Sequence, residues 1–511
     1  RKNNLSVIFN IVSLKSNIMD SKPKILFFLD VFYLHFCLAY YLQSTLDSDN
    51  YAIIDTNSKP KVFFKNQSLV NFKKTWFFHD NISKKKIDPD LNYLLKFENK
   101  YGIDLWKLAI NERFFYKHNR FYKFSKNEIL SILEQECKFF ETILDEIKPD
   151  YLLIYDPPFH YQKLLLELCK SKNVKVLSIC GTGIENKVIL TSNGATFDLE
   201  SDELPVNYTP SSNSVKKNNY DSTVGKYLKH RETKFTDKFR ALCDYFFNVS
   251  SDDINSNFMY YGKSKFNVFT DQLKLEFKKR KNFDFIQKHS TLNPNLEIPF
   301  VYFPMNVDEE MNLLHYAPFY NNQIEIIRYI AKSIPIEYVL FVKEHIASKL
   351  RAWHEPNYYK EILEIPNVVL IHPNFDNNTL VKHSKLIFGI RGTTPLKALK
   401  YRKPSIVFGD QPFEILPSIF KINSLTSLPD LITESLKHQV DPLDYEKYEK
   451  LLQNRLIEFN MFEYEYQRDV NFFSGKVLSN VTISESHMDE FLQQNKNSFS
   501  KLVDFHTKLI S

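Results

Sequence analysis

Three ionisable residues follow an apolar run in the second half of the chain, where a buried strand would end. These residues are Lys343, Glu344 and His345. Parallel α/β sheets bind their ligands at the carboxyl ends of the strands, so this position favours a functional role. Lys343 is suited to pair with a diphosphate, and His345 to bind a phosphate or protonate a leaving oxygen, with Glu344 orienting either one. A solvated surface loop is the alternative.

A glycine turn further along the chain is a second candidate. Arg391 and Gly392 follow another apolar run, and Thr393 and Thr394 come next. Pro395 then suits the first turn of a helix. The amides at such a helix start form a seat for phosphate oxygens together with the two hydroxyls, and Arg391 adds a forked cation. A tight strand–helix connection without a ligand is the alternative.

Acidic and amide residues surround the first apolar run of the same region. Asp308, Glu309 and Glu310 follow it directly. Their carboxylates are potential metal ligands, but a solvated acidic turn is the interpretation we favour, and we predict no metal. Asn322 and Gln323 begin the next helical pattern, where they either line the site or cap the helix.

The N-terminal half supplies candidates for a general base. Asp156 follows the apolar run 151–155, and Glu185 follows the next predicted strand. A carboxylate at such a strand end can act as a general base. Asp30 and His35 are weaker candidates for this role. For each of these residues a structural salt bridge is the alternative.

Alternating strand and helix patterns must position these residues. In the first half the predicted strands are 25–30, 51–55, 61–64, 75–78, 151–155 and 174–179, with helices over 35–42, 125–147 and 161–169. In the second half, strands 300–303, 338–342, 368–371, 386–390 and 405–408 alternate with helices 322–333, 358–363, 379–383 and 395–400. Helices are also predicted over 236–249 and 265–288. This alternation predicts an α/β fold with two Rossmann-like, doubly wound parallel sheets.

These patterns divide the chain into two α/β domains with flanking segments. The expected division is a non-native leader before Met19 (1–18), an N-terminal domain (19–250) with a mobile loop (196–235), a C-terminal domain (251–425) and a C-terminal helical segment (426–511). The polar last segment is expected to pack back across both domains.

Composition excludes several classes of protein. The 511 residues include 67 basic and 61 acidic side chains, a net charge of +6 that is too balanced for a nucleic-acid binder. The five cysteines are odd in number and widely spaced, so the sequence predicts neither a disulfide framework nor a zinc site, and favours a reducing, cytoplasmic compartment. The basic run Lys278–Lys281 is either a solvated helix end or a contact with an anionic membrane or lipid-linked acceptor.

The ordered motifs of the second half resemble those of the bacterial capsule polysaccharide and surface carbohydrate biosynthesis proteins. The matching residues are Tyr302-Phe303-Pro304-Met305, Glu310, Asn322-Gln323, Val342-Lys343-Glu344-His345, Pro366-Asn367-Val368, Gly392-Thr393, Ala398-Leu399, Lys403-Pro404 and Gly409. Proteins of this family look like glycosyltransferases of the two-Rossmann (GT-B) type. The N-terminal half is similar in architecture only.

The resemblance implies a GT-B-like glycosyltransferase that uses a nucleotide sugar as co-substrate, with no other cofactor. The donor nucleotide would lie on the C-terminal domain, and a growing glycan or lipid-linked saccharide would approach from the N-terminal domain. The residues implied for the donor site are Glu310, Asn322, Gln323, Lys343, Glu344, Arg391, Gly392, Thr393, Thr394 and Lys397. Such a protein would work at the inner face of the membrane, with peripheral association. A sugar-nucleotide epimerase, a glycerophosphate-type polymer transferase and an inactive scaffold are the alternatives.

The chain departs from the family pattern at three positions. Ile346 stands where the family usually has Pro, and Asn306 where a His is common. The family also tends to carry Glu where this chain has Lys397. An acid there often holds the donor ribose in related enzymes, and a lysine cannot accept that hydrogen bond. Lys397 therefore indicates either altered donor binding or lost activity.

Overall fold

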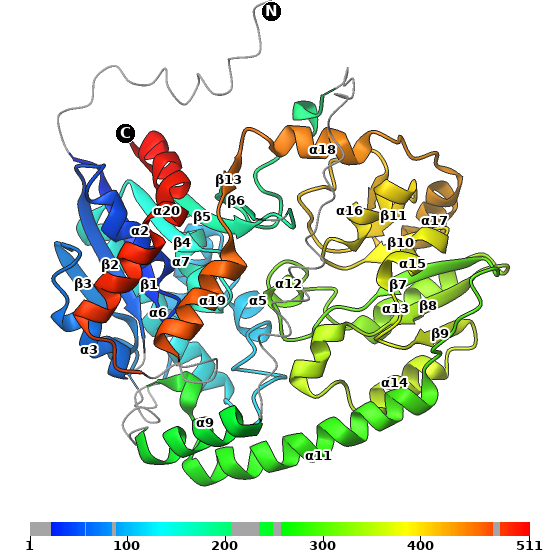
Figure 1. Ribbon diagram of the computed structural model, residues 1–511, viewed down its shortest axis with the longest axis horizontal. Helices are drawn as coiled ribbons and strands as arrows, with labels where there is room; N and C mark the ends of the chain where they lie inside the picture. The colour runs from blue at the N-terminus through cyan, green and yellow to red at the C-terminus, as the bar shows by residue number, and fades with distance from the viewer. Residues whose placement is uncertain are drawn as a thin grey trace, which may run out of the picture.

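Two α/β lobes, each built on its own sheet, make up the protein (Figure 1). The computed structural model describes residues 22–56, 58–83, 88–184, 186–205, 235–248, 257–473 and 481–511. The predicted leader, most of the predicted mobile loop (206–234) and Glu185 lie outside these residues. The predicted fold class, two Rossmann-like lobes, is confirmed.

The N-terminal sheet has the strand order β13-β6-β5-β4-β1-β2-β3. Its strands are β1 (Lys24–Asp30), β2 (Asp49–Asp55), β3 (Lys74–Phe77), β4 (Tyr151–Tyr155), β5 (Lys175–Gly181), β6 (Lys187–Thr191) and β13 (Leu456–Glu458). The pairings of β5 with β6 and of β6 with β13 are antiparallel, and the others are parallel. The predicted strands that the structure contains all pair in parallel, and the antiparallel edge of β6 and β13 was not predicted. Strand β6 is antiparallel because only a short link joins it to β5, whereas a parallel crossover needs a dozen residues or more.

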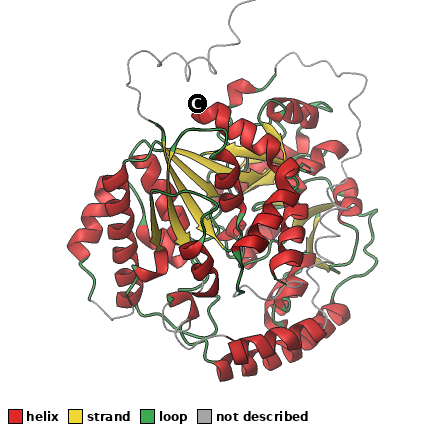
Figure 2. Ribbon diagram, turned by 60° about the vertical axis from the view of Figure 1, so that its left-hand side comes forward, coloured by secondary structure: helices red, strands yellow, loops and turns green. Residues whose placement is uncertain are grey.

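Both faces of the N-terminal sheet are buried. Ile25 and Phe27 of β1 pack in one core cluster with α2 (Leu34–Leu42) and α20 (Glu485–Ile510). Leu26 and Phe28 pack in a second cluster with α6 (Lys126–Ile147) and α7 (His160–Ser171). This alternation explains the continuous apolar run of β1, because each face of the pleat meets its own layer of helices (Figure 2).

Residues 61–64 were expected to form a strand and lie instead in α3 (Ser58–Asn66). A short apolar run does not distinguish a strand from a buried helical turn. Strands β2 and β3 are parallel neighbours, so the chain between them must cross over the sheet, and α3 lies in that crossover. Phe63 and Phe64 both pack against Phe36 of α2.

The C-terminal sheet is parallel throughout, with the order β12-β11-β10-β7-β8-β9. Its strands are β7 (Phe300–Pro304), β8 (Val339–Lys343), β9 (Val368–Ile371), β10 (Ile387–Gly389), β11 (Ser405–Val407) and β12 (Ile419–Lys421). Its helices are α12 (Met311–Leu314), α13 (Gln323–Ser333), α14 (Pro356–Leu363), α15 (Asn377–His383), α16 (Thr394–Ala398) and α17 (Leu428–Lys437). The chain moves outward from β7 to β9 and then returns to the other side of β7 as β10. Open α/β sheets bind ligands at this kind of reversal.

The remaining helices belong to the N-terminal lobe, connect the lobes, or return the chain from the second lobe to the first. They are α4 (Leu91–Tyr101), α5 (Leu105–Ile110), α9 (Phe235–Asn248), α11 (Lys265–His289), α18 (Asp444–Leu452) and α19 (Met461–Phe472). After α18 the chain adds β13 to the N-terminal sheet, and α20 packs on α2, so the last segment spans both lobes (Figure 1). Among the described helices, none has the length and apolar content that a bilayer crossing demands.

Candidate functional site

The reversal point of the C-terminal sheet brings together residues from three adjacent strands. Asn306, just after β7, donates a hydrogen bond from its side chain to the backbone carbonyl of Arg391 at 2.6 Å. On the other side, the Met305 amide donates to the carbonyl of Lys343 at 2.9 Å. Neighbouring strands lie about 4.8 Å apart, so Arg391 and Lys343 flank β7 at a backbone separation of about 10 Å. The two βα loops predicted to form one site therefore lie on either side of the loop that follows β7.

Lys343 is buried at this edge, with 8% of its surface exposed. Its ammonium forms no hydrogen bond or ion pair with another described residue, and burial lowers its pKa to about 8 although Asp376 and Glu344 favour the charged form. A buried cation without a close partner is unfavourable. An anion bound here would remove that cost.

His372 directly follows β9, next to the end of β8 where Lys343 lies, and the sequence analysis did not identify it. Its Nδ1 accepts a hydrogen bond from the Asn374 amide at 3.2 Å, so the neutral ring carries its hydrogen on Nε2. Within the described chain this buried Nε2 has no partner. Its position at a strand end was the signal that could have revealed it. A second uncommitted donor therefore lies near Lys343, whose charge helps to lower the pKa of His372 after the larger effect of burial.

The turn after β10 has the backbone form that the sequence suggested. Gly392 has φ +125°, a backbone conformation that residues other than glycine rarely adopt. Thr393 occupies the N-cap position of α16 without a side-chain capping bond, and Pro395 lies in the first turn. On the neighbouring loop, His345 is exposed and its Nδ1 accepts from the Ala347 amide at 3.1 Å, which leaves Nε2–H toward solvent.

Arg391 is committed to protein partners in this conformation. Its guanidinium donates to the backbone carbonyls of Gly194 at 2.9 Å and Ala195 at 2.7 Å, and to that of Asp410. It also lies 4.6 Å from the ring centre of Tyr316. Gly194 and Ala195 belong to the N-terminal lobe, so Arg391 joins the two lobes.

Glu344 anchors the loop that follows β8. Its buried carboxylate accepts hydrogen bonds from Ser348 at 2.8 Å, His354 at 2.6 Å and Tyr359 at 2.8 Å. Burial opposes the charge on His354, but Glu344 and then Asp308 raise its pKa to about 10. Glu344 therefore holds its own loop in place and has little capacity left for a ligand.

Gln323 has a similar bracing role. Its amide exchanges two hydrogen bonds with the backbone of Asn306, at 2.8 and 2.9 Å, and donates to Asp308 at 2.6 Å. Asn322 and Glu310 stand at the N-cap positions of α13 and α12, and neither side chain makes a capping bond. Burial raises the pKa of the Glu310 carboxyl.

Asp156 directly follows β4, which borders β1 at the reversal point of the N-terminal sheet, and its side chain contacts the other lobe. Its buried carboxylate accepts a hydrogen bond from the Tyr316 hydroxyl. Burial raises its pKa, against the opposing effects of Tyr316 and Arg391. The structure thus brings the predicted base into one interlobe cluster with Arg391.

The two weaker base candidates differ in their surroundings. Asp30 ends β1 and accepts from the Phe32 amide at 2.9 Å, and burial followed by the charge of Asp55 raises its pKa to about 7. His35 lies inside α2, where burial lowers its pKa to about 3. His35 is a neutral core residue.

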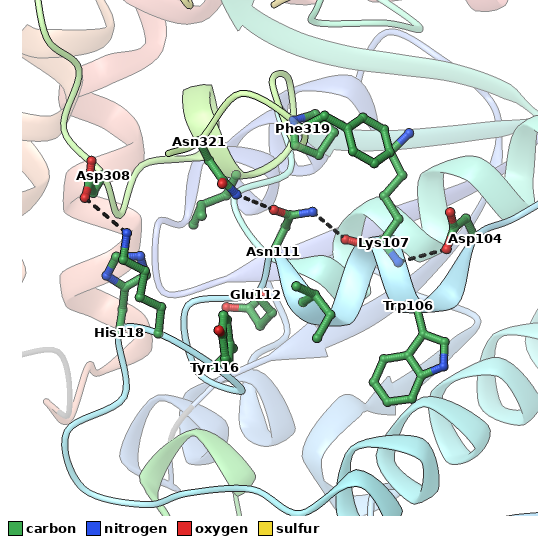
Figure 3. A pocket seen from close by; sticks show the side chains of 14 residues that line it. Asp104, Trp106, Lys107, Asn111, Glu112, Tyr116, His118, Asp308, Phe319 and Asn321 are labelled. Carbon is green, nitrogen blue, oxygen red and sulfur yellow. Dashed lines mark hydrogen bonds and ion pairs between the residues drawn. The ribbon is translucent and has the colours of Figure 1, made fainter. Parts of the chain in front are cut away.

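A cavity of about 370 Å³ opens at the seam between the lobes (Figure 3). One wall is α5 with the loop after it, and the other is the chain around α12. Its lining includes the aromatic side chains of Trp106, Tyr116 and Phe319. Asn111 and Asn321 face each other across the seam, with a 2.7 Å hydrogen bond from the Asn321 amide (Figure 3). The sequence analysis missed this cavity because the first wall carries no strand pattern.

Comparison with known proteins gives a likeness of fold. No protein-family model matches the sequence, and no curated protein matches it. The solved structures include KpsC, a β-Kdo 2,7-transferase from Thermosulfurimonas dismutans, at 11% identity over 70% of this chain and 89% of that chain, with a TM-score of 0.31. They also include a UDP-GlcNAc 2-epimerase from Methanocaldococcus jannaschii, at 11% identity over 84% of this chain and 99% of that one, with a TM-score of 0.23. At these values the likeness assigns no activity.

Proposed function

We propose that this protein is a glycosyltransferase that moves a sugar from a nucleotide donor to a capsule or surface polysaccharide acceptor. The observation that carries the proposal is the buried, uncommitted ammonium of Lys343 at the reversal point of the C-terminal sheet. A donor diphosphate supplies the anion that this lysine lacks. The motif resemblance of the same loops to surface carbohydrate enzymes supports the choice of a nucleotide sugar.

In this proposal the diphosphate lies between the β8 and β10 loops. Lys343 pairs with one phosphate, and the backbone of Gly392 with the hydroxyls of Thr393 and Thr394 binds the other. The Nε2–H of His345 donates to the leaving phosphate oxygen. The nucleotide sugar is the co-substrate, and these cationic and amide groups stabilise the leaving charge without a resident metal.

Asp156 is the proposed base for the acceptor hydroxyl. A raised pKa strengthens a carboxylate as a base, and Asp156 lies on the acceptor side of the seam. Its carboxylate is bound to Tyr316 in this conformation, so the proposal requires the lobes to separate enough for an acceptor to replace that hydroxyl.

The seam cavity is the proposed acceptor site. Aromatic rings such as Trp106 and Phe319 suit the apolar faces of sugars, and the Asn111 and Asn321 amides suit their hydroxyls. Asp308 lines the same cavity and accepts a hydrogen bond from Gln323. Gln323 in turn is hydrogen-bonded to the backbone of Asn306, in the loop that follows β7 next to the donor site. An acceptor in the cavity would therefore lie next to the donor.

Calorimetric titration with UDP-, GDP- and CMP-sugars tests the donor site. We expect one nucleotide class to bind, and Lys343→Met to weaken that binding by about tenfold to a hundredfold, the value of a hydrogen bond to a charged group. Lys382→Met, an exposed lysine of α15, is the matched control and should leave the affinity unchanged. Absence of binding by all three classes, or equal effects of the two substitutions, would contradict the proposal.

Product analysis in deuterated water separates transfer from epimerisation. A transferase releases the nucleotide and leaves the sugar carbons unlabelled. An epimerase that exchanges a proton at carbon retains the nucleotide–sugar bond and incorporates deuterium. Deuterium in unconsumed donor would favour the epimerase over the function proposed here.

A further inference from the structure

Helices α9 and α11 run along one side of the molecule, beneath both lobes (Figure 1). They carry unusually exposed aromatic side chains. Phe239 and Phe247 of α9 are 60% and 83% exposed, and Phe266 and Phe277 of α11 are 72% and 77% exposed. In the described chain only one other phenylalanine, Phe319, is exposed to this degree. The clustering matters more than the number, because phenylalanine is abundant in this sequence.

The exposed residues of α11 form one stripe. Phe266, Leu273 and Phe277 are spaced at i, i+7 and i+11, which places them on the same face of a helix. The opposite face carries Asn282 and Ile286, which are buried, and Asn282 donates to the carbonyl of Ala352 at 2.9 Å. The helix is thus held on the C-terminal lobe by one face and presents the apolar stripe to solvent.

Basic residues border this stripe. The 25 residues of α11 contain seven Lys or Arg and three Asp or Glu. Exposed Lys274, Arg280, Lys281 and Lys288 lie within a quarter turn of the stripe and form no ion pair with other described residues. The helix therefore carries a clear excess of basic over acidic side chains.

We propose that the outer surface of α9 and α11 docks on an anionic phospholipid bilayer. Exposed aromatic residues enter the boundary between headgroups and acyl chains, and flanking Lys and Arg attract anionic headgroups. A symmetric dimer through this face would bring two strongly basic helices together, and that repulsion favours lipid over a second copy as the partner. This inference is independent of the activity proposed above.

Co-sedimentation with vesicles tests the charge. We expect the protein to bind vesicles of 70% phosphatidylcholine and 30% phosphatidylglycerol, to bind pure phosphatidylcholine weakly, and to dissociate as salt rises. Each basic residue contributes about 1 kcal/mol, or roughly fivefold in affinity, so Lys274→Gln/Arg280→Gln/Lys281→Gln should lower binding on the order of a hundredfold. The matched control is Lys496→Gln/Lys501→Gln/Lys508→Gln on exposed positions of α20, which should bind normally.

A second pair of variants tests the aromatic stripe. Phe266→Ser/Phe277→Ser should lower vesicle binding by at least about tenfold, since each ring would lose partial burial in the interface. Ile336→Ser, at a fully exposed position between α13 and β8, should have no effect. Thermal melting establishes that the variants are folded. Phe266 and Phe277 are both exposed enough to tolerate serine. Three results would overturn the proposal. The first is equal binding to neutral and anionic vesicles, and the second is unchanged vesicle binding of the α11 glutamine and serine variants. The third is a dimer, detected by light scattering, that becomes a monomer in the serine variant.

Discussion

Asp55, at the end of β2 in the N-terminal lobe, accepts hydrogen bonds from Tyr161 at 2.6 Å and His79 at 2.7 Å. Lys343, at the end of β8 in the C-terminal lobe, has no such partner, and the Nε2 of His372 beside it is also uncommitted in the described chain. Within the described residues both edges carry buried polar atoms without a partner, Thr56 Oγ1 and His79 Nδ1 at the first and His372 Nε2 at the second. The edges differ in their charged groups, because the Asp55 carboxylate is paired and the Lys343 ammonium is not paired with any described residue. A strand end therefore does not by itself indicate a binding site, whereas an unpaired buried charge at that end does.

The contrast with Lys343 is greatest at His160 in the N-terminal lobe, where both ring nitrogens have a partner. Its ring lies between two carboxylates, with Glu112 at 2.9 Å and Glu136 at 3.0 Å, and all three side chains are fully buried. Burial opposes the charged form of Glu112, but the hydrogen bond and charge of His160 lower its pKa to about 2. This group of residues holds α7 against α6 and the loop after α5.

Breaking that triad should have the largest effect. Glu112→Gln removes one partner of a buried ion pair and should lower the free energy of unfolding by about 3–5 kcal/mol, measured by urea denaturation. Glu146→Gln breaks the exposed pair with Lys74 and should change it by less than about 1 kcal/mol. Similar losses in the two variants would show that the N-terminal pairs are not the structural elements inferred here.

The seam between the two edges provides the next test. A Cβ on Gly194 would lie 2.5 Å from the Tyr316 hydroxyl and closer still to the Asp156 carboxylate. Gly194→Ala should therefore force the lobes apart and destabilise the closed form by about 1–3 kcal/mol. Small-angle scattering should show a larger radius of gyration. Gly181→Ala is the control, because a Cβ there has open space and should leave the radius unchanged. An unchanged radius in Gly194→Ala would mean that the cluster does not close the seam.

The sequence predicted most strands and helices, and it placed Lys343, Arg391 and Asp156 at the carboxyl ends of strands, where the structure also has them. It did not distinguish which of these groups the fold had already satisfied. Two of the three carbonyls that hold Arg391 come from residues nearly 200 positions away, and local periodicity carries no information about such contacts. His372 was missed for the opposite reason, since one histidine after a strand is unremarkable until its unpartnered nitrogen is seen.

The pH dependence of nucleotide binding sharpens the comparison for Lys343. Burial lowers its pKa to about 8 in the free protein, and a bound phosphate should raise it. The cationic form binds the anion, so affinity should be flat below about pH 8 and fall as pH rises above it, by at most tenfold per pH unit. Calorimetry between pH 7 and 9.5 measures this. Lys343→Met should remove the high-pH fall, and a fall that persists in the variant would assign it to another group.

Substitution of Lys397 should have the smallest effect on donor affinity. It lies in the short helix α16, where its amide donates to the Thr393 carbonyl at 3.0 Å. Lys397 is in the last turn of this five-residue helix, where the helix dipole does not oppose a cation. An exposed charge contact with the donor phosphate is worth about 0.2–1 kcal/mol, so Lys397→Glu should lower donor affinity by about two- to fivefold. Lys382→Glu on α15 controls for the change in net charge. Unchanged affinity in Lys397→Glu would mean that Lys397 makes no contact with the donor. Improved affinity would mean that this site binds the donor better with the acid that the similar family carries at this position.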